Sequence, residues 1–302
     1  MAMGTSSKDF YDRIIGGEDH WISEMAGCSW LNYVRSILAT SIAIVSMIHL
    51  EQKSVLVHCS DGWDRTSQLC SIAQILLDPY FRTIKGLCVL IEKDWISFGH
   101  KFRERFGHFD EDGERSPVFL QFLDCLYQLV RQFPTIFEYN VNLLNFIGYH
   151  VTSCRFGTFL ANNERERISM KLHCKTPSIW SYIFECVQRE QSHSLSSSST
   201  CCYLSEQFVN HQYKPCLDVL FPDHRAIQLS LWPFYLRADP FPSATVPTSD
   251  STVSPHTPYF QSLESMLIDN QTFYQSQQSQ LNRHLYRAQQ QLDQLKKGKI
   301  KT

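Results

Sequence analysis

With 302 residues, 43% of them hydrophobic, the chain is long enough to form one large domain or two smaller ones around a sizeable core. Its 28 Lys and Arg residues against 30 Asp and Glu residues give a net charge of -2, which argues against nucleic acid as a partner and leaves any membrane attraction to a local patch. The eleven cysteines show no C-x-x-C spacing. A disulfide framework and a zinc finger are therefore disfavoured, and we expect reduced thiols in a cytoplasmic protein.

The sequence predicts neither a membrane span nor a signal peptide. Residues 36–50 are the most apolar stretch, but they are fewer than the roughly 20 residues that a spanning helix needs. The first ten residues lack the apolar region of a signal peptide. We therefore expect a protein that touches membranes only from the water side.

The first half of the chain alternates helical patterns with one apolar run. Helical spacing of apolar residues predicts helices at 31–48, 69–76, 118–133 and 137–151, and Pro79 is expected to end the second of them. Residues 54–57 are apolar and partly β-branched, which is typical of a buried strand. The order of helix, strand, loop and helix predicts an α/β module.

The second half changes composition several times. Residues 187–202 are polar and serine-rich, which predicts a flexible insertion, whereas the aromatic residues within 203–239 indicate a segment packed on the core. Residues 241–258 are rich in Pro, Ser and Thr and predict a disordered linker between a domain at 1–240 and a tail at 259–302.

The tail carries a short heptad pattern. Its apolar positions alternate in spacings of four and three, which is the seam of a coiled coil: Leu281, Leu285, Ala288, Leu292 and Leu295. Two heptads are few for a coiled coil, so a solvated amphipathic helix is the alternative. We expect dimerisation through residues 281–295.

The chemistry concentrates in residues 55–69, VLVHCSDGWDRTSQL. Cys59 follows the apolar run and precedes a predicted helix, whose free N–H groups and positive dipole end favour a phosphate dianion and a thiolate. Gly62 permits the backbone turn that aims successive N–H groups inward. Cys59 is therefore predicted to be a nucleophile in a Cys-x5-Arg phosphate-binding loop.

The other polar residues of the loop complete this chemistry. The planar guanidinium of Arg65 matches two phosphoryl oxygens and stays charged. A leaving alkoxide needs a proton, which either Asp61 or Asp64 could supply if its pKa were raised, and the spacing alone does not choose between them. Thr66 could donate to the Cys59 sulfur and ease breakdown of a phosphocysteine.

The motif HCSDGWDRT resembles the signature of the myotubularins, a branch of the protein tyrosine phosphatase superfamily that acts on inositol lipids. The resemblance covers about residues 20–240, through LLDPYFRTIKG, LIEKDWISFGHKF, RSPVFLQFLDC, QFPTIFEYN, FGTFLANN and TPSIWSYI. It implies an α/β fold, with a protein tyrosine phosphatase-like sheet flanked by helices and followed by the coiled-coil helix.

The resemblance also implies roles for individual residues. Cys59 would be the nucleophile, Arg65 the phosphate ligand and Asp64 the general acid. The substrate-binding loop would comprise Ser60, Asp61, Gly62, Trp63 and Thr66, with the first four offering backbone amides to the D3 phosphate. Lys101 and Arg105, one helical turn apart, would approach a second, D1 phosphate. No metal or cofactor is implied.

The family pattern also begins further upstream than this chain. A lipid-binding PH-GRAM domain and several sheet strands would precede the loop, and the 58 residues before Cys59 cannot hold them, so we expect the N-terminally truncated part of a longer protein.

Three functions remain open on the sequence. The first is a phosphatase that removes the D3 phosphate of phosphatidylinositol 3-phosphate and phosphatidylinositol 3,5-bisphosphate through a phosphocysteine. The second is a regulatory subunit that pairs with another myotubularin. The third is a phosphatase of phosphoproteins. The expected partners are a phosphoinositide headgroup at a membrane surface and a second myotubularin chain, and the expected location is cytoplasmic, peripheral on endosomal or other phosphoinositide-bearing membranes.

Overall fold

The computed structural model describes residues 29–108, 114–193 and 207–236. All of them belong to the first of two compact units of the chain, residues 1–246, and the second unit is residues 247–302. The predicted linker at 241–258 and the predicted coiled coil at 281–295 therefore lie outside the described residues.

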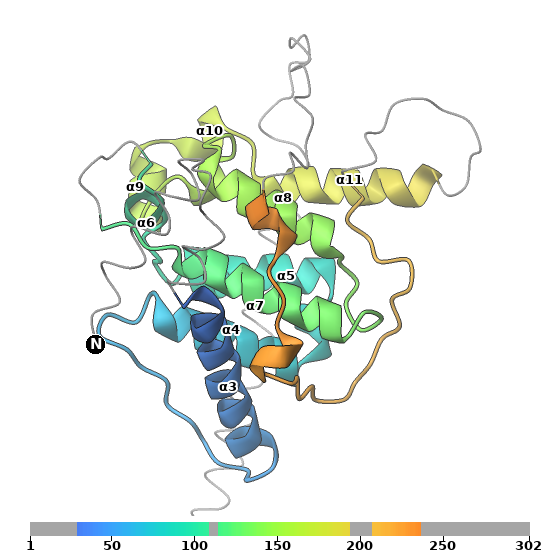
Figure 1. The fold of residues 1–302 in the computed structure, drawn as a ribbon. Helices are drawn as coiled ribbons and strands as arrows, with labels where there is room; N and C mark the ends of the chain where they lie inside the picture. The colour runs from blue at the N-terminus through green and yellow to red at the C-terminus, as the bar shows by residue number, and fades with distance from the viewer. Residues whose placement is uncertain (1–28, 109–113, 194–206, 237–302) are drawn as a thin grey trace, which may run out of the picture. The chain divides into compact units, whose positions relative to one another are not determined.

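Helices make up the regular structure of the described part (Figure 1). The α-helices are α3 (Trp30–His49), α4 (Arg65–Leu77), α5 (Ile84–Ile91), α6 (Phe102–Phe106), α7 (Val118–Gln132), α8 (Val141–Thr152), α9 (Glu164–Ser169), α10 (Leu172–Lys175) and α11 (Ile179–His193). Short 3₁₀ turns are η1 (Pro79–Arg82), η3 (Gly157–Phe159), η5 (Ala226–Gln228) and η6 (Pro233–Leu236), and η2 (Glu92–Ile96) is a π turn. The four predicted helices are thus confirmed as α3, α4, α7 and α8.

The predicted buried strand is wrong for residues 54–57. The segment runs extended into the loop, but it pairs with no strand among the described residues, where the only bridge joins Tyr139 and Val209. Leu56 is 88% exposed. A strand is stable only when a neighbour satisfies its backbone groups and covers one face, and the described part of the chain supplies no such neighbour here.

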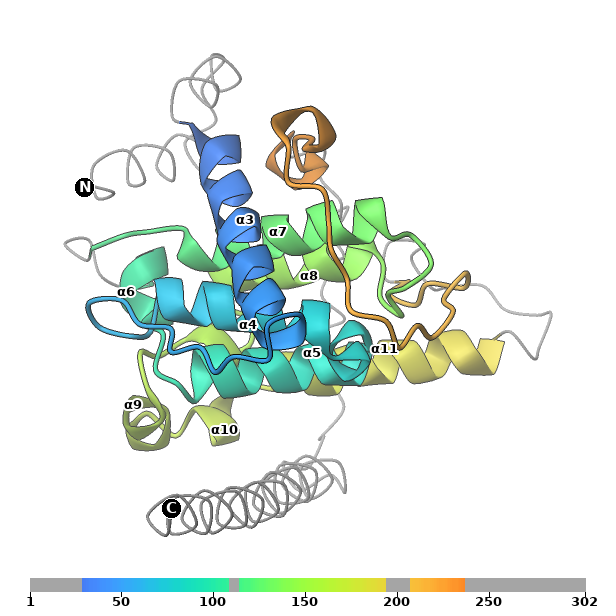
Figure 2. The same cartoon turned by 90° about the horizontal axis from the view of Figure 1, so that it is seen from below.

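Helix α7 forms the centre of the described unit. Almost every side chain from Val118 to Val130 is buried, and α7 packs against α3, α4 and α8 (Figure 2). Helix α3 turns one face to this core, with Val34, Leu38 and Val45 spaced so that they share that face. The position of α4 is fixed by Gln68, whose amide donates to the Val118 carbonyl at 2.8 Å.

Of the described helices, α3 is the one whose length and composition would allow it to cross a bilayer. The apolar stretch at 36–50, from which no membrane span was expected, covers only part of α3. Core helices of soluble proteins pass the same test, so this is weak evidence, and one face of α3 is packed on α4 and α7.

The C-terminal end of α4 is anchored by a buried arginine. As predicted, α4 ends before Pro79, and the Asp78 side chain accepts from the backbone of η1. Arg82 then donates to four carbonyl oxygens, two at the end of α4 and two in the later segment: Ile75, Leu76, Cys216 and Asp218, at 2.8–2.9 Å. This arginine ties the helix that begins at the loop to a segment over 130 residues away.

The first residues of the predicted serine-rich insertion are helical. Residues 187–193 continue α11, and 194–202 lie outside the described residues. The aromatic segment is packed on the core in its described part, residues 207–236, which Figure 1 shows running along α8 and α7. Phe208, Trp232 and Tyr235 are buried there, and the Trp232 indole donates to Asn145 of α8 at 2.9 Å.

Candidate active site

The loop of residues 59–64 connects the extended segment to the first turn of α4. Gly62 has a φ of +94°, a left-handed conformation that costs a glycine little. This turn aims the Gly62 N–H at the Cys59 sulfur, 3.1 Å away. The Gly62 amide thus faces the Cys59 sulfur, and phosphate binding by the loop amides stays a prediction.

Cys59 is half-buried and its thiol is acidic. Burial raises its pKa, but the hydrogen bond from Gly62 and the polar groups of the Thr66 side chain and of the Thr66 and Asp61 backbones outweigh burial and lower the pKa from 9.0 to about 7. Hydrogen bonds to the sulfur stabilise the thiolate. The lowered pKa therefore favours the thiolate at neutral pH, relative to an ordinary cysteine.

Arg65 lies on the exposed side of the loop. Its guanidinium donates to the Ser60 hydroxyl at 3.2 Å, and that hydroxyl donates to Asp61 at 3.1 Å. Asp61 is exposed as well. The cation is therefore held beside the loop opening, where it remains accessible to an anion.

Asp64 occupies a different environment, with 19% of its side chain exposed. One carboxylate oxygen lies 2.8 Å from Nδ1 of His100, and the other accepts from Arg105 at 2.9 Å. Burial raises the pKa of Asp64, but these two partners outweigh it and lower the pKa to about 2. Asp64 therefore lacks the raised pKa that a general acid requires.

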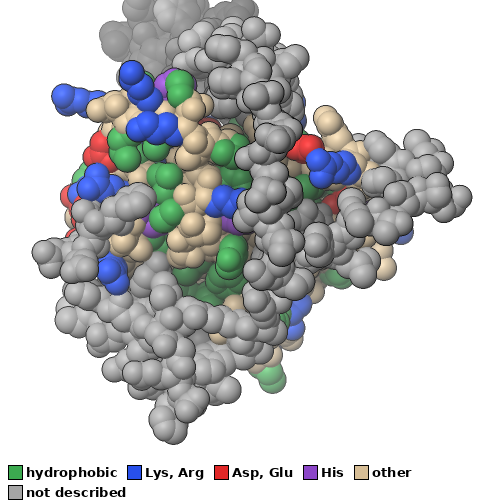
Figure 3. Space-filling view, turned by 90° about the horizontal axis from the view of Figure 1, so that it is seen from above, with side chains coloured by type: hydrophobic (Ala, Val, Ile, Leu, Met, Phe, Trp, Pro, Cys, Tyr) green, Lys and Arg blue, Asp and Glu red, His purple; other side chains and the backbone are tan. Residues whose placement is uncertain are grey.

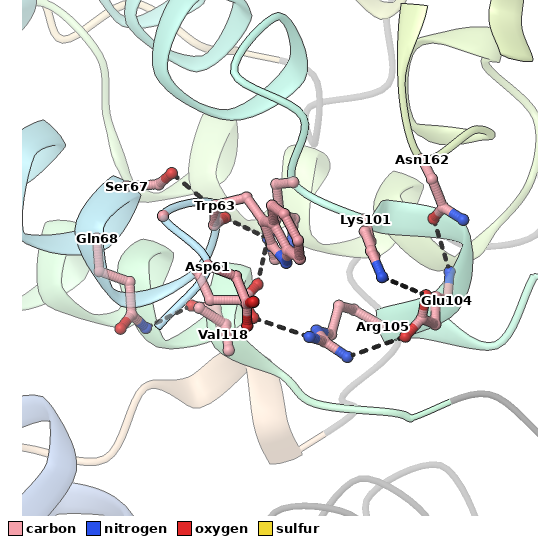
Figure 4. Close-up of polar contacts among 12 residues, drawn as sticks. Asp61, Trp63, Ser67, Gln68, Lys101, Glu104, Arg105, Val118 and Asn162 are labelled. Atoms are coloured by element: carbon pink, nitrogen blue, oxygen red, sulfur yellow. Dashed lines mark hydrogen bonds and ion pairs between the residues drawn. The ribbon is translucent and has the colours of Figure 1, made fainter. Parts of the chain in front are cut away.

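Lys101, just before α6, and Arg105, within α6, both approach the loop (Figure 4). Lys101 precedes the helix and places its ammonium 5.0 Å from the centre of the Trp63 ring, while it pairs with Glu104 at 3.2 Å. Only 8% of the Arg105 side chain is exposed, and it contacts Glu104 and Glu114 besides Asp64. Contact of either residue with a second phosphate stays a prediction.

His100 is the site residue that the sequence reasoning missed. It stands in the quoted segment SFGHKF beside Lys101, yet a single histidine between a glycine and a lysine gave no reason to place it under the loop. Its contact with Asp64 joins residues 36 positions apart. Within the described residues, no group of three or more His, Cys, Asp or Glu side chains is arranged to hold a metal ion.

An acidic cysteine at a helix N-terminus, with an arginine at the sixth position after it, defines the phosphate-binding loop of the cysteine-dependent phosphatases. Residues 4–168 match the family description "Myotubularin-like phosphatase domain". The chain belongs to the myotubularin family.

Three relatives illustrate the similarity. The phosphatidylinositol-3,5-bisphosphate 3-phosphatase MTMR8 of Homo sapiens is 51% identical over 166 residues, 55% of this chain and 24% of the relative. The phosphatidylinositol-3-phosphate phosphatase MTMR7 of Mus musculus is 52% identical over 166 residues, which are 55% of this chain and 25% of the relative. Myotubularin of Xenopus laevis is 44% identical over 228 residues, which are 74% of this chain and 35% of the relative. The chain thus spans between about a quarter and a third of the length of these relatives.

Proposed function

We propose that the chain is a phosphoinositide 3-phosphatase, which removes the D3 phosphate of phosphatidylinositol 3-phosphate and of phosphatidylinositol 3,5-bisphosphate. The observation that carries the proposal is the Cys59 thiol, whose pKa lies near 7 in a loop that ends at the N-terminus of α4. The names of MTMR8 and MTMR7 support the choice of an inositol lipid as substrate.

The proposed reaction begins with phosphate binding by the loop amides, the α4 dipole and Arg65. The Cys59 sulfur attacks phosphorus, and the bond from phosphorus to the inositol oxygen breaks. The leaving oxygen takes a proton from Asp64. Water then gives a proton to Asp64 and attacks phosphorus, and the phosphorus–sulfur bond breaks, which releases inorganic phosphate and restores the Cys59 thiolate.

Asp64 must gain a proton before it can donate one. A phosphate dianion in the loop lies close to this carboxylate, and a nearby like charge raises a carboxyl pKa. Substrate binding is therefore expected to reverse the effect of His100 and Arg105, so that Asp64 carries a proton when the leaving oxygen needs it.

The lipid would be met at a membrane surface, with Lys101 beside the loop to attract a second phosphate. Figure 3 shows one face of the molecule, on which Lys and Arg side chains stand in separate small groups among apolar and other side chains. Peripheral attachment to endosomal or similar membranes is part of this proposal, and so is pairing with a second myotubularin chain.

The experiment is phosphate release from short-chain phosphatidylinositol 3-phosphate by the full chain, its Cys59→Ser variant and a Cys174→Ser control. Cys174 is an exposed thiol on α10. Release by the chain and by the control, but not by Cys59→Ser, is expected, with inhibition by vanadate and no loss in EDTA. A folded chain that released nothing would favour a regulatory binding subunit, and faster cleavage of a phosphopeptide would favour a protein phosphatase.

A further inference from the structure

His100 is held in a fixed position under the phosphate loop. It follows Gly99, whose φ of +91° makes the turn that leads to α6. None of its side chain is exposed. The imidazole packs edge-on against Trp95 at 5.0 Å and Phe102 at 4.7 Å between ring centres. The ring therefore has little freedom to turn.

One nitrogen of this ring contacts two consecutive residues of the loop. Nδ1 lies 2.9 Å from the Trp63 carbonyl oxygen and 2.8 Å from a carboxylate oxygen of Asp64. A carbonyl oxygen can only accept, so Nδ1 must carry the hydrogen. The other nitrogen, Nε2, is buried with no hydrogen-bond partner in the described part of the chain, so the polar contacts of the ring are directed at the loop.

The His100 N–H is directed at the Trp63 carbonyl, and the Asp64 oxygen lies beside it at 2.8 Å without a hydrogen bond of its own, so Asp64 can change partners at low cost. Arg105 holds the second carboxylate oxygen at 2.9 Å, so the two contacts together set the orientation of the carboxylate. When Asp64 turns its first oxygen toward a leaving group, the His100 N–H keeps the Trp63 carbonyl as an acceptor. No buried donor is left unpaired by the movement.

We propose that His100 is a positioning residue for the phosphatase reaction: it orients Asp64 for proton donation and holds the Trp63–Asp64 part of the loop. This rests on the proposed function. His100 touches neither phosphate nor the leaving group and acts through Asp64. Its removal should therefore harm the cleavage of substrates whose leaving group needs a proton, and spare substrates whose leaving group does not.

The test compares His100→Leu and His100→Asn with the unmodified full chain on two substrates. Leu fills the space without a donor, whereas the Asn amide nitrogen can take the place of Nδ1. The lipid substrate has an alkoxide leaving group, and difluoromethylumbelliferyl phosphate has an acidic phenol. We expect His100→Leu to lower kcat on the lipid by about 100-fold, as loss of general acid catalysis does, with KM little changed.

On the aryl phosphate the same variant should lose no more than about fivefold, and His100→Asn should recover most of the lipid activity. Equal losses on both substrates, with Asn no better than Leu, would show a merely structural role. If His100→Leu does not fold, His100→Gln replaces it, because the Gln amide reaches the position of Nε2 and not that of Nδ1.

A second measurement separates this inference from the proposed function. If the unmodified chain cleaves neither substrate, the proposed function fails, and the Asp64 carboxyl is titrated by carbon-13 NMR instead. His100→Leu should then raise the pKa of Asp64 above about 2, and His100→Asn should raise it less. An unchanged titration of Asp64 in His100→Leu would overturn the positioning role.

Discussion

The acidity of Cys59 depends on very few atoms. The thiol stands where a helix N-terminus favours a thiolate, yet burial by itself raises its pKa, and the polar groups of Thr66 and of the loop backbone bring it to about 7. Of these donors, only the Thr66 hydroxyl belongs to a side chain. It can therefore be removed without altering the backbone of the loop.

Thr66→Val is expected to raise the pKa of Cys59. A rise of one unit would leave about one molecule in ten with a thiolate at pH 7, so alkylation by iodoacetamide should slow about fivefold at that pH. The measurement is mass spectrometry of the Cys59 peptide after alkylation across a pH series. Thr66→Ser keeps the hydroxyl and is the control. An unchanged profile in Thr66→Val would assign the acidity to the backbone alone.

At the scale of elements, the loop is positioned by what holds α4 at its two ends. Gln68 connects its first turns to α7, and Arg82 caps its last carbonyl groups while holding residues 216–218. A planar guanidinium can serve carbonyl groups on several sides at once, whereas an ammonium has three donors at one point. Arg82 is therefore poorly replaced even by lysine.

Arg82→Lys should lower the free energy of unfolding by about 2–4 kcal/mol, because buried carbonyl groups lose their donors. Urea denaturation followed by tryptophan fluorescence measures this change. Arg225→Lys, at an exposed arginine whose side chain pairs with its near neighbour Asp223, is the matched control and should change stability by less than about 0.5 kcal/mol. Equal effects of the two substitutions would contradict the anchoring role.

The extended segment before Cys59 makes a separate prediction. Leu56 is almost fully exposed, whereas Leu38 of α3 is fully buried. Leu56→Ser should change the unfolding free energy by less than about 0.5 kcal/mol, and Leu38→Ala should cost about 2–5 kcal/mol. The same urea experiment compares them. A large loss in Leu56→Ser would mean that this segment is covered by a part of the chain outside the described residues.

At the scale of the whole molecule, one buried carboxyl joins three distant parts of the described unit. Asp124 of α7 accepts from the Trp30 indole of α3 at 2.7 Å and from the Tyr235 hydroxyl of η6 at 3.1 Å, and Gln128 donates to its other oxygen. Burial raises the pKa of Asp124, and the three hydrogen bonds reduce the rise, which leaves it at about 6. A carboxyl that holds its proton more tightly in the folded state makes that state less stable as the pH rises.

Stability should therefore fall between about pH 4 and pH 6, by roughly 3 kcal/mol at most, since the pKa differs by about two units between the folded and unfolded states. Above pH 6 this contribution is constant. Asp124→Asn, which has no titrating group, should remove this slope, whatever its effect on absolute stability. Urea denaturation of the unmodified chain and of Asp124→Asn at pH 4, 5, 6 and 7 measures this pH dependence of the unfolding free energy. A slope that survives in Asp124→Asn would assign it to other groups.

Self-association belongs to the same scale and rests on the sequence alone. The apolar seam at 281–295 predicts that the chain forms a dimer through its tail. Sedimentation of the full chain should give about twice the mass of one chain, and a chain ending near Pro258 should sediment as a monomer. A shortened chain that stayed as large as the full one would rule out the coiled coil as the dimer contact.

The helices and the loop chemistry were accessible from sequence because both are local. A repeat of apolar residues three and four apart reports which face of a helix is buried, and the spacing of Cys59, Gly62 and Arg65 reports a loop that precedes a helix. The strand at 54–57 was wrong for the opposite reason. An apolar run shows that a segment could be buried, but strand formation needs a partner from elsewhere in the chain.

By itself the sequence determined the family, the helices around the core and the spacing of Cys59 and Arg65 in the loop before α4, since each is encoded in neighbouring residues. Only the tertiary structure decided what surrounds Asp64. His100 and Arg105 lie 36 and 41 positions further along the chain, and their approach to the carboxylate depends on how η2 and α6 fold back onto the loop. The charge of Asp64 follows from those contacts, because a pKa responds to distance in space and not to distance in sequence.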